Sequence, residues 1–302
     1  MLPFVTIHKA IQNQAGRGAA IQRYPAVFFA WLLPIFRVYC PDFMARMVVD
    51  VREECQVKKG TLKQILLITD GCSNKGEDPA VTAALAMQQG MTVNVIGILE
   101  DDQTESPDGL QEVEDIASSG GGISQLVYKQ ALAETVQTVT KQAMTQTLQG
   151  FVNQELKQIL GPEQSLEEIE PEKRGEIMEV VEDMGETCDL EVLVLTDTSA
   201  SMYDKLPTVK EALIDLSISL NARIGRNRFS IFSFPGKRKD IDNVLDWSPK
   251  LDSISTIFPK LTSGGITPTG PAIREAIYQF GKKGLLENMR DEDGPGMEET
   301  GH

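Results

Sequence analysis

The chain has 302 residues, 41% of them hydrophobic and 24% charged, which is the composition of a globular protein and excludes fibrous or wholly disordered chains. Its net charge of −15 argues against partners with phosphate backbones or anionic lipids, so we expect neither nucleic-acid nor membrane binding. The cysteines are scattered and form no CxxC pair, which argues against a disulfide framework and a zinc ribbon and favours the reducing cytoplasm. They are Cys40, Cys55, Cys72 and Cys188.

Residues 1–56 differ from the rest of the chain because they are rich in aromatic residues and carry a net positive charge. Their longest apolar run, residues 26–36, contains Pro34 and is shorter than the roughly 20 residues that a membrane-spanning helix needs. The Arg-Glu-Glu triplet at 52–54 can be encoded by a purine-rich run that resembles a ribosome-binding site, and Val57 by a GTG start codon. We therefore interpret residues 1–56 as an extension of doubtful status and Val57 as a candidate start.

From residue 60 onward, strand-like and helix-like segments alternate, which is the pattern of a parallel sheet covered by helices on both faces. Residues 64–70 (QILLITD) predict a strand buried on both sides that ends in a carboxylate. We expect next a helix at 79–89, a strand at 92–98, a helix from 106, a turn at 120–122 and a strand at 125–129. A long helix should then run from 132 and either continue past Gly150 or be rejoined there.

The segment between residues 162 and 191 contains twelve acidic and two basic residues. Pro171 predicts the start of a helix and Gly185 its end, with an apolar stripe between them. We interpret residues 151–189 as an acidic helical bridge whose helix lies on the surface; a docking helix for a basic partner is the alternative. The stripe consists of Ile177, Val180, Val181 and Met184.

After this bridge the alternation resumes with a second buried strand that ends in a carboxylate, residues 191–197 (EVLVLTD). We expect a helix with apolar positions from 209 to 220, strands at 228–234 and 243–247, a loop at 261–270, a helix at 271–280 that ends at Gly281, and a disordered tail at 285–302. The whole pattern predicts an α/β fold with a doubly wound, mostly parallel six-stranded sheet, built from residues 60–150 and 190–284.

Chemistry is expected at the carboxyl ends of the strands, where open parallel sheets bind their ligands. Three loops qualify: those after the two carboxylate-ending strands and the one before residue 271. Their oxygen donors, without any Cys or His ligand, suit Mg²⁺ or Mn²⁺ with retained water and are too poor in carboxylates for a tight calcium site. These donors are Asp70, Asp197, Ser199, Ser201 and Thr267.

The same residue types also have ordinary structural uses. Ser199 and Ser201 could cap the helix that follows them, and Asp70 could form an Asx turn. Taken singly, these residues leave both interpretations open.

Three strings carry a resemblance to a known family. DTSASM at 197–202, GGITPTG at 264–270 and ITDG at 68–71 resemble the three parts of the metal-ion-dependent adhesion site of von Willebrand factor A domains. In that family the DxSxS strand comes first, whereas here the TDG strand precedes it. We therefore expect one circularly permuted domain, in preference to two truncated halves that would each bury only half a sheet.

The resemblance implies which residues would hold the metal. Ser199 and Ser201 would ligate it directly, and Asp197, Thr267 and Asp70 would do so directly or through water. Longer strings, GTLKQILLITDGCSN at 60–74 and PTVKEALIDLSISLNARIG at 207–225, are similar to the YabS-type proteins of spore-forming bacteria. That similarity implies a cytoplasmic, sporulation-linked protein but no particular activity.

The resemblance implies a binding module in which the metal accepts an Asp or Glu carboxylate of a protein partner. A Mg²⁺-dependent phosphatase that uses Asp70 or Asp197 is the first alternative. We do not expect an enzyme, because His8 and His302 lie outside the expected domain and the metal loops contain no lysine. The second alternative is a scaffold that acts through the acidic bridge without a metal.

Overall fold

The computed structural model describes residues 61–71, 73–99, 107–160, 166, 169–237, 239–249 and 266–292, all within one compact unit, Val48–His302. The predictions for residues 1–56, for Val57, for Gly264 and Gly265, and for the end of the tail lie outside these residues. None of the described helices is both long and apolar enough to cross a lipid bilayer.

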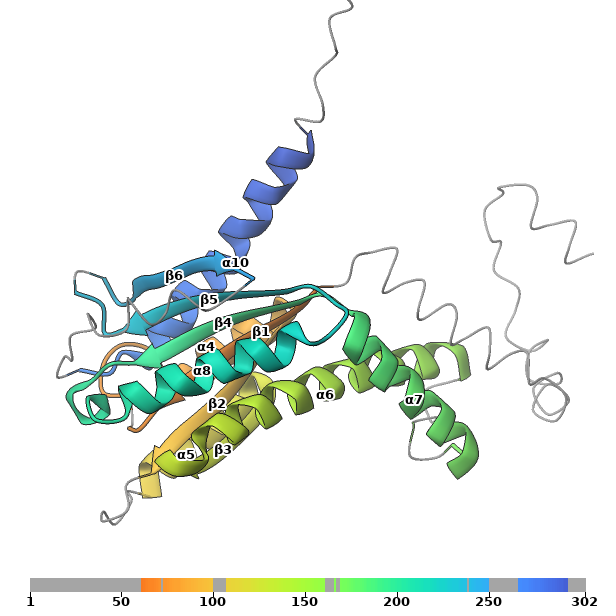
Figure 1. Cartoon of the computed structure of the whole chain (residues 1–302), viewed down its shortest axis with the longest axis horizontal. Coiled ribbons are helices and arrows are strands. Elements are labelled where there is room, and N and C mark those ends of the chain that lie inside the picture. Colours follow the sequence, from red (N-terminus) through yellow and green to blue (C-terminus); the bar gives the residue numbers. More distant parts are fainter. Residues whose placement is uncertain are drawn as a thin grey trace, which may run out of the picture. The chain divides into compact units, whose positions relative to one another are not determined.

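Six strands form one sheet in the order β3-β2-β1-β4-β5-β6 (Figure 1). Neighbouring strands are parallel except β6, which runs antiparallel to β5. Every residue of β4 is buried, which explains its unbroken apolar sequence. The predicted mostly parallel, doubly wound sheet is confirmed. The strands are β1 (Leu62–Thr69), β2 (Met91–Leu99), β3 (Gly121–Tyr128), β4 (Leu190–Asp197), β5 (Asn227–Phe234) and β6 (Asp242–Ser248).

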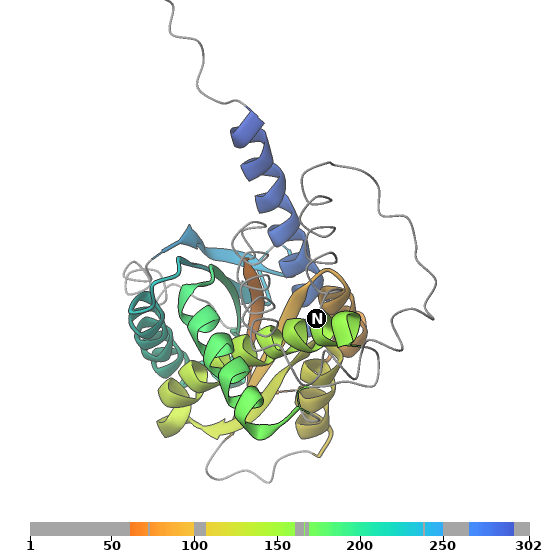
Figure 2. The ribbon, with the colours of Figure 1, turned by 90° about the vertical axis from the view of Figure 1, so that its right-hand side faces the viewer.

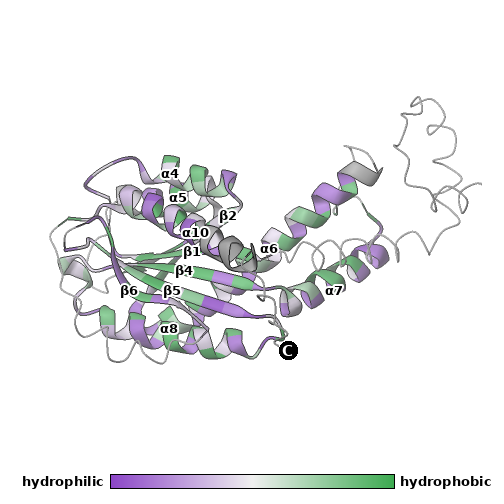
Figure 3. Ribbon diagram, turned by 90° about the horizontal axis from the view of Figure 1, so that it is seen from above, coloured by the Kyte–Doolittle hydropathy of each residue, from purple (hydrophilic) through white to green (hydrophobic). Residues whose placement is uncertain are grey.

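Helices cover both faces of this sheet. Figure 3 shows α4, α5 and α10 on one side and α8 on the other, where α6 also packs, since Gln64 of β1 donates to the Thr140 carbonyl of α6 at 3.4 Å. The helices are α4 (Pro79–Gln88), α5 (Pro107–Ser119), α6 (Leu132–Leu160), α7 (Pro171–Thr187), α8 (Leu206–Asn221) and α10 (Thr269–Glu292), with short 3₁₀ turns η1 (Lys129–Ala131) and η3 (Ala200–Met202).

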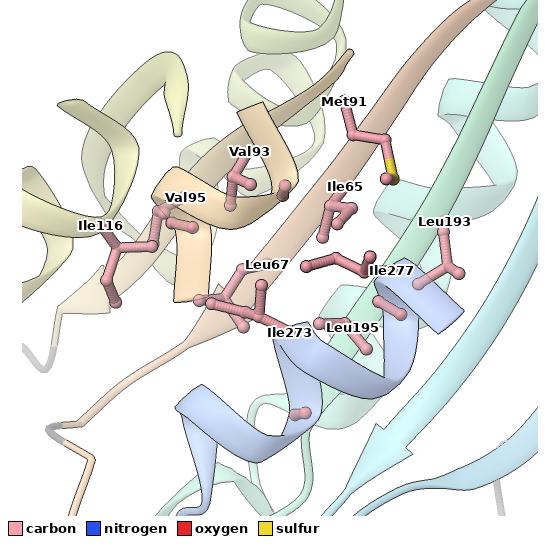
Figure 4. Packing of buried hydrophobic residues seen from close by; sticks show 14 of the residues in the cluster. Ile65, Leu67, Met91, Val93, Val95, Ile116, Leu193, Leu195, Ile273 and Ile277 are labelled. Atoms are coloured by element: carbon pink, nitrogen blue, oxygen red, sulfur yellow. The ribbon is translucent and has the colours of Figure 1, made fainter. Parts of the chain in front are cut away.

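The core under α10 joins the two parts of the chain. Ile65 of β1 and Leu193 of β4 pack in one apolar cluster with Ile273 of α10 (Figure 4), and all three are fully buried. Burying one such side chain stabilises a fold by about 1.5–3 kcal/mol. Residues before and after the acidic bridge therefore share a single core.

Helices α6 and α7 correct the interpretation of the bridge. α6 continues through Gly150 without a break, which decides between the two predicted alternatives, and α7 packs against it at an angle (Figures 1 and 2). Gly185 does not end α7, which continues to Thr187. It is buried, and a Cβ at this position would lie 3.6 Å from the Met144 side chain and 3.9 Å from the Leu148 side chain of α6. Three residues of the apolar stripe, Ile177, Val181 and Met184, are buried, so the helix is part of the fold, and its acidic residues are exposed.

The helix α10 is longer than the sequence predicts. Gly281 lies inside it, and α10 continues to Glu292, into the segment expected to be a disordered tail. The reason is that the residues around Gly281 and Gly284 include strong helix formers, which outweigh the cost of about 1 kcal/mol for each helical glycine. Lys283 of this extension forms a buried ion pair with Glu191, whose strand neighbour is Lys63. α10 therefore passes beside the amino ends of β1 and β4.

The expected turn at residues 120–122 is also partly wrong, because β3 already begins at Gly121. Gly121 has a φ of +64°, in the left-handed region that favours glycine. A Cβ at Gly122 would lie 2.0 Å from the carbonyl oxygen of Val93, so the close approach of β2 and β3 requires glycine there. Gly121 and Gly122 are therefore the first residues of β3 and not part of a turn before it.

Candidate metal-binding site

The residues expected to bind metal gather where β1 and β4 end. These strands are neighbours at the centre of the sheet, and the chain leaves them in opposite directions, from β1 through α4 to β2 and from β4 through α8 to β5. Ligands of open α/β sheets bind at such a switch point. The register pairs Ile68 with Thr196, so Thr69 and Asp197 follow side by side.

Asp197 is the buried centre of this region. One carboxylate oxygen accepts the hydroxyl of Thr69 at 2.7 Å, and the other accepts the backbone N–H of Ser199 at 2.8 Å. Burial raises the pKa of Asp197 to about 6, against the lowering effect of these hydrogen bonds and with a further rise from the nearby charge of Asp70. A cation beside this carboxylate would favour its ionised form.

Asp70 is connected to the loop after β4. Its Oδ1 accepts the hydroxyl of Ser201 at 2.9 Å, and the hydroxyls of Ser199 and Ser201 are 3.1 Å apart. Four of the five predicted residues therefore form one cluster of oxygen atoms, although Asp70 and Ser201 are 131 residues apart in sequence. Ser199 makes no capping hydrogen bond with its side chain, which removes the helix-cap interpretation for this residue.

The fifth residue, Thr267, lies in the loop that enters α10 and is attached to the loop after β1. Its N–H donates to the Asn74 side chain at 2.8 Å, and its carbonyl accepts the Asn74 N–H at 3.1 Å and the Ser73 hydroxyl at 3.2 Å. Thr267 is buried, with 6% of its surface exposed. Asn74 and Ser73 were not predicted; they are polar residues just beyond ITDG, which was the available signal.

The loop after β1 is also held from α5. The carboxylate of Glu112 accepts the N–H of Ser73 at 2.7 Å. Burial raises the pKa of Glu112, opposed by this hydrogen bond and assisted by the charge of Asp78. Glu112 thus helps to fix the backbone that carries Asp70 and contacts Thr267.

The expectation that no lysine enters this region is wrong. Lys205, the residue just before α8, places its ammonium group on Oδ2 of Asp70, and both side chains are almost fully buried. Lys205 lies between the 3₁₀ turn η3 and α8, where its sequence context gives no signal that its side chain is buried.

The donor set fits a hard divalent cation of the Mg²⁺ or Mn²⁺ type. Within the described part of the chain, no group of three or more His, Cys, Asp or Glu side chains could hold a metal. Two carboxylates and the hydroxyls of the serine pair remain, and such a set leaves coordination positions for water or for an incoming oxygen. Two residues after Thr267 in sequence, the buried hydroxyl of Thr269 has no hydrogen-bond partner within the described residues.

Comparison with known proteins identifies the relatives of this chain. No family model matches it. It is 62% identical over 245 residues to the uncharacterized protein YabS of Bacillus subtilis, which covers 81% of this chain and all of that protein. The chain belongs to the YabS family.

A solved structure supports the same fold for this family member. The crystal structure of an uncharacterized protein from Alicyclobacillus acidocaldarius superposes with a TM-score of 0.67 and 41% sequence identity, covering 76% of this chain and 96% of that one. Neither name states an activity, so the argument for function depends on the site itself.

Proposed function

We propose that this chain is a divalent-metal-dependent protein-binding module of the von Willebrand factor A type. In this proposal Mg²⁺ or Mn²⁺ binds among Asp70, Asp197, Ser199, Ser201 and Thr267, and a partner's Asp or Glu carboxylate completes its coordination. The observation that carries the proposal is the cluster of carboxylate and hydroxyl oxygens at the switch point, joined by contacts of 2.7–3.1 Å.

The connectivity of the sheet supports a circularly permuted domain. β1, which carries the TDG string, and β4, which carries DxSxS, are adjacent although their order in the chain is reversed relative to that family. The Lys283–Glu191 pair brings α10 beside the start of β1, where an unpermuted chain would connect helix to strand. Nearby ends of this kind are what permutation of a domain requires.

The hydrogen bonds suggest how the ligands divide their work. Ser199 and Ser201 present hydroxyl oxygens next to each other, which suits direct ligation. Asp70 accepts the hydroxyl of Ser201 on Oδ1, so in our proposal it orients Ser201 and contributes to metal binding directly or through water. Asp197 retains lone pairs beyond its two hydrogen bonds and can take either role.

The setting of this function is part of the proposal. The resemblance to the YabS-type proteins of spore-forming bacteria, together with the scattered cysteines, favours a cytoplasmic role in sporulation-linked regulation or assembly. The proposal assigns no catalytic residue, because metal-bridged recognition needs no general base.

The test is retention of a partner from sporulating-cell lysate on immobilised protein, with Mg²⁺ or with a chelator. Wild type and Ser199→Ala are compared with Asp204→Asn, a matched control that changes an exposed carboxylate in the same loop. A protein retained with Mg²⁺ by wild type and Asp204→Asn, and lost with Ser199→Ala or chelator, supports the proposal. Equal retention under all conditions contradicts it and favours metal-independent contact through the acidic face of α7.

A further inference from the structure

A buried ion pair belongs to the candidate site. Only 7% of the Lys205 side chain and 1% of the Asp70 side chain are exposed. Lysine is almost never buried to this degree unless it is paired. The ammonium group of Lys205 is therefore held at the carboxyl end of the sheet by the charge of Asp70.

The same carboxylate serves both the lysine and the serine pair. Oδ2 of Asp70 accepts the Lys205 ammonium, while Oδ1 accepts the hydroxyl of Ser201, which in turn lies 3.1 Å from the hydroxyl of Ser199. The carboxylate of Asp70 thus lies between the positive charge of Lys205 and the hydroxyls that would ligate a metal.

We infer that Lys205 is a tethered cation that a divalent metal must displace from Asp70 when it binds. This inference rests on the proposed function, because it concerns how the same site is filled. Two cations close together in a poorly hydrated region repel strongly. Part of the free energy of metal binding is then spent on moving the ammonium group, so the affinity for metal is weaker than the oxygen donors alone would give.

The device also keeps the metal-free protein folded. A buried carboxylate without a partner is strongly destabilising, and Lys205 neutralises Asp70 when no metal does so. The site can then exchange between an ammonium-held and a metal-held state without unfolding. Binding of a partner through the metal would follow the supply of divalent cations.

The first test is a titration of the protein with Mn²⁺, in which the electron paramagnetic resonance signal of the free ion measures how much metal is bound. Lys205→Met removes the charge but keeps an unbranched apolar side chain, and Lys210→Met in α8 is the matched control. We expect the dissociation constant of Lys205→Met to be lower by about tenfold or more, with the control equal to wild type. Without metal, Lys205→Met should melt at a lower temperature than wild type, and Mn²⁺ should raise its melting temperature more.

A second measurement uses the wild-type chain and does not depend on folding of the variant. Amine-reactive labelling of Lys205, quantified by mass spectrometry, should increase severalfold in saturating Mn²⁺, while labelling of Lys210 stays constant. Unchanged labelling of Lys205 in Mn²⁺-bound protein would overturn the inference.

The outcomes separate this inference from the proposed function. Equal Mn²⁺ affinity of wild type and Lys205→Met overturns the role of Lys205 and leaves the metal site standing. Binding by Lys205→Met alone supports the lysine as a replacement for the metal and overturns metal-dependent function in the natural chain. Binding by neither protein overturns both.

Discussion

Thr69 donates its hydroxyl to the carboxylate of Asp197 at 2.7 Å, and this buried contact joins β1 to β4 across 128 residues of sequence. It links the last residue of one strand to the last residue of its neighbour, so the parts of the chain on either side of the acidic bridge meet at the candidate site. A buried carboxylate keeps its charge only if such donors remain. The contact therefore bears on both stability and metal binding.

Replacing Thr69 by Val removes the hydroxyl and keeps the shape of the side chain. We expect the free energy of unfolding to fall by about 1–3 kcal/mol, because Asp197 loses a donor in a buried position. Urea unfolding at neutral pH measures this change, and Thr145→Val on the exposed side of α6 should stay within about 0.5 kcal/mol of wild type. A loss no larger than that of the control would contradict the assigned role of Thr69.

The pKa of Asp197 predicts a pH dependence of stability in the presence of a chelator. Burial raises this pKa from 3.8 to about 6, so between these values the folded chain holds a proton that the unfolded chain has lost. The contribution of Asp197 to the free energy of unfolding therefore grows as pH falls from about 7 towards 4. It is absent from Asp197→Asn.

Urea unfolding at several pH values tests this sign. Wild type and Asp204→Asn should gain stability relative to Asp197→Asn as the solution is acidified through about pH 6. Parallel pH profiles for wild type and Asp197→Asn would mean that Asp197 titrates normally.

Two glycines should respond to alanine in opposite directions. Gly150 is helical, and a Cβ there meets nothing within 4 Å, so Gly150→Ala should stabilise the fold by about 0.5–1 kcal/mol. Gly122→Ala should destabilise it, because the new methyl would collide with the Val93 carbonyl. Melting temperatures of the two variants provide the comparison, and a stable Gly122→Ala would contradict the close approach of β2 and β3.

The ion pair between Lys283 and Glu191 predicts how the end of α10 is attached. Lys283→Met leaves Glu191 buried without its partner and should lower the free energy of unfolding by about 3 kcal/mol. The double variant Lys283→Met/Glu191→Gln should recover part of this loss, because no charge is then left unpaired. Losses that simply add in a double-mutant cycle would show that the two side chains do not interact.

Exposed apolar side chains near the site in sequence are candidates for contact with a partner. Tyr203, two residues after Ser201, is 67% exposed, and Ile266, just before Thr267, is 42% exposed. Aromatic side chains often dominate protein interfaces. Tyr203→Ala should reduce Mg²⁺-dependent retention of the partner at unchanged Mn²⁺ affinity, whereas Tyr278→Ala on α10 serves as an exposed control. Equal retention by both variants would place the interface away from Tyr203.

The sequence predicted the strands well because buried strands are marked by long apolar runs. Residues 64–70 and 191–197 lie within one or two residues of β1 and β4 as observed. Glycines misled the prediction at positions 185 and 281, because a glycine ends a helix only when the following residues also favour a turn, and both positions lie inside helices here. Local signals do not include the packing that decides such cases.

The candidate site likewise contains residues that the sequence predicted and one residue, Lys205, that it did not. The oxygen donors could be named from strand ends, since carboxyl ends of neighbouring parallel strands meet at one edge. Lys205 could not be placed in this manner, because a lysine before a surface helix normally points to solvent. Its burial depends on Asp70, which comes from a distant part of the chain, and only the folded structure brings the two together.

The most direct measurement of the central claim is an anomalous difference map at the manganese absorption edge, from crystals of the full chain grown with MnCl₂. We predict one strong peak about 2 Å from the hydroxyl oxygens of Ser199 and Ser201, which disappears in crystals of Ser199→Ala. If crystals grown in saturating MnCl₂ show no peak beside these hydroxyls, or show the metal bound elsewhere, the assignment of this site is contradicted.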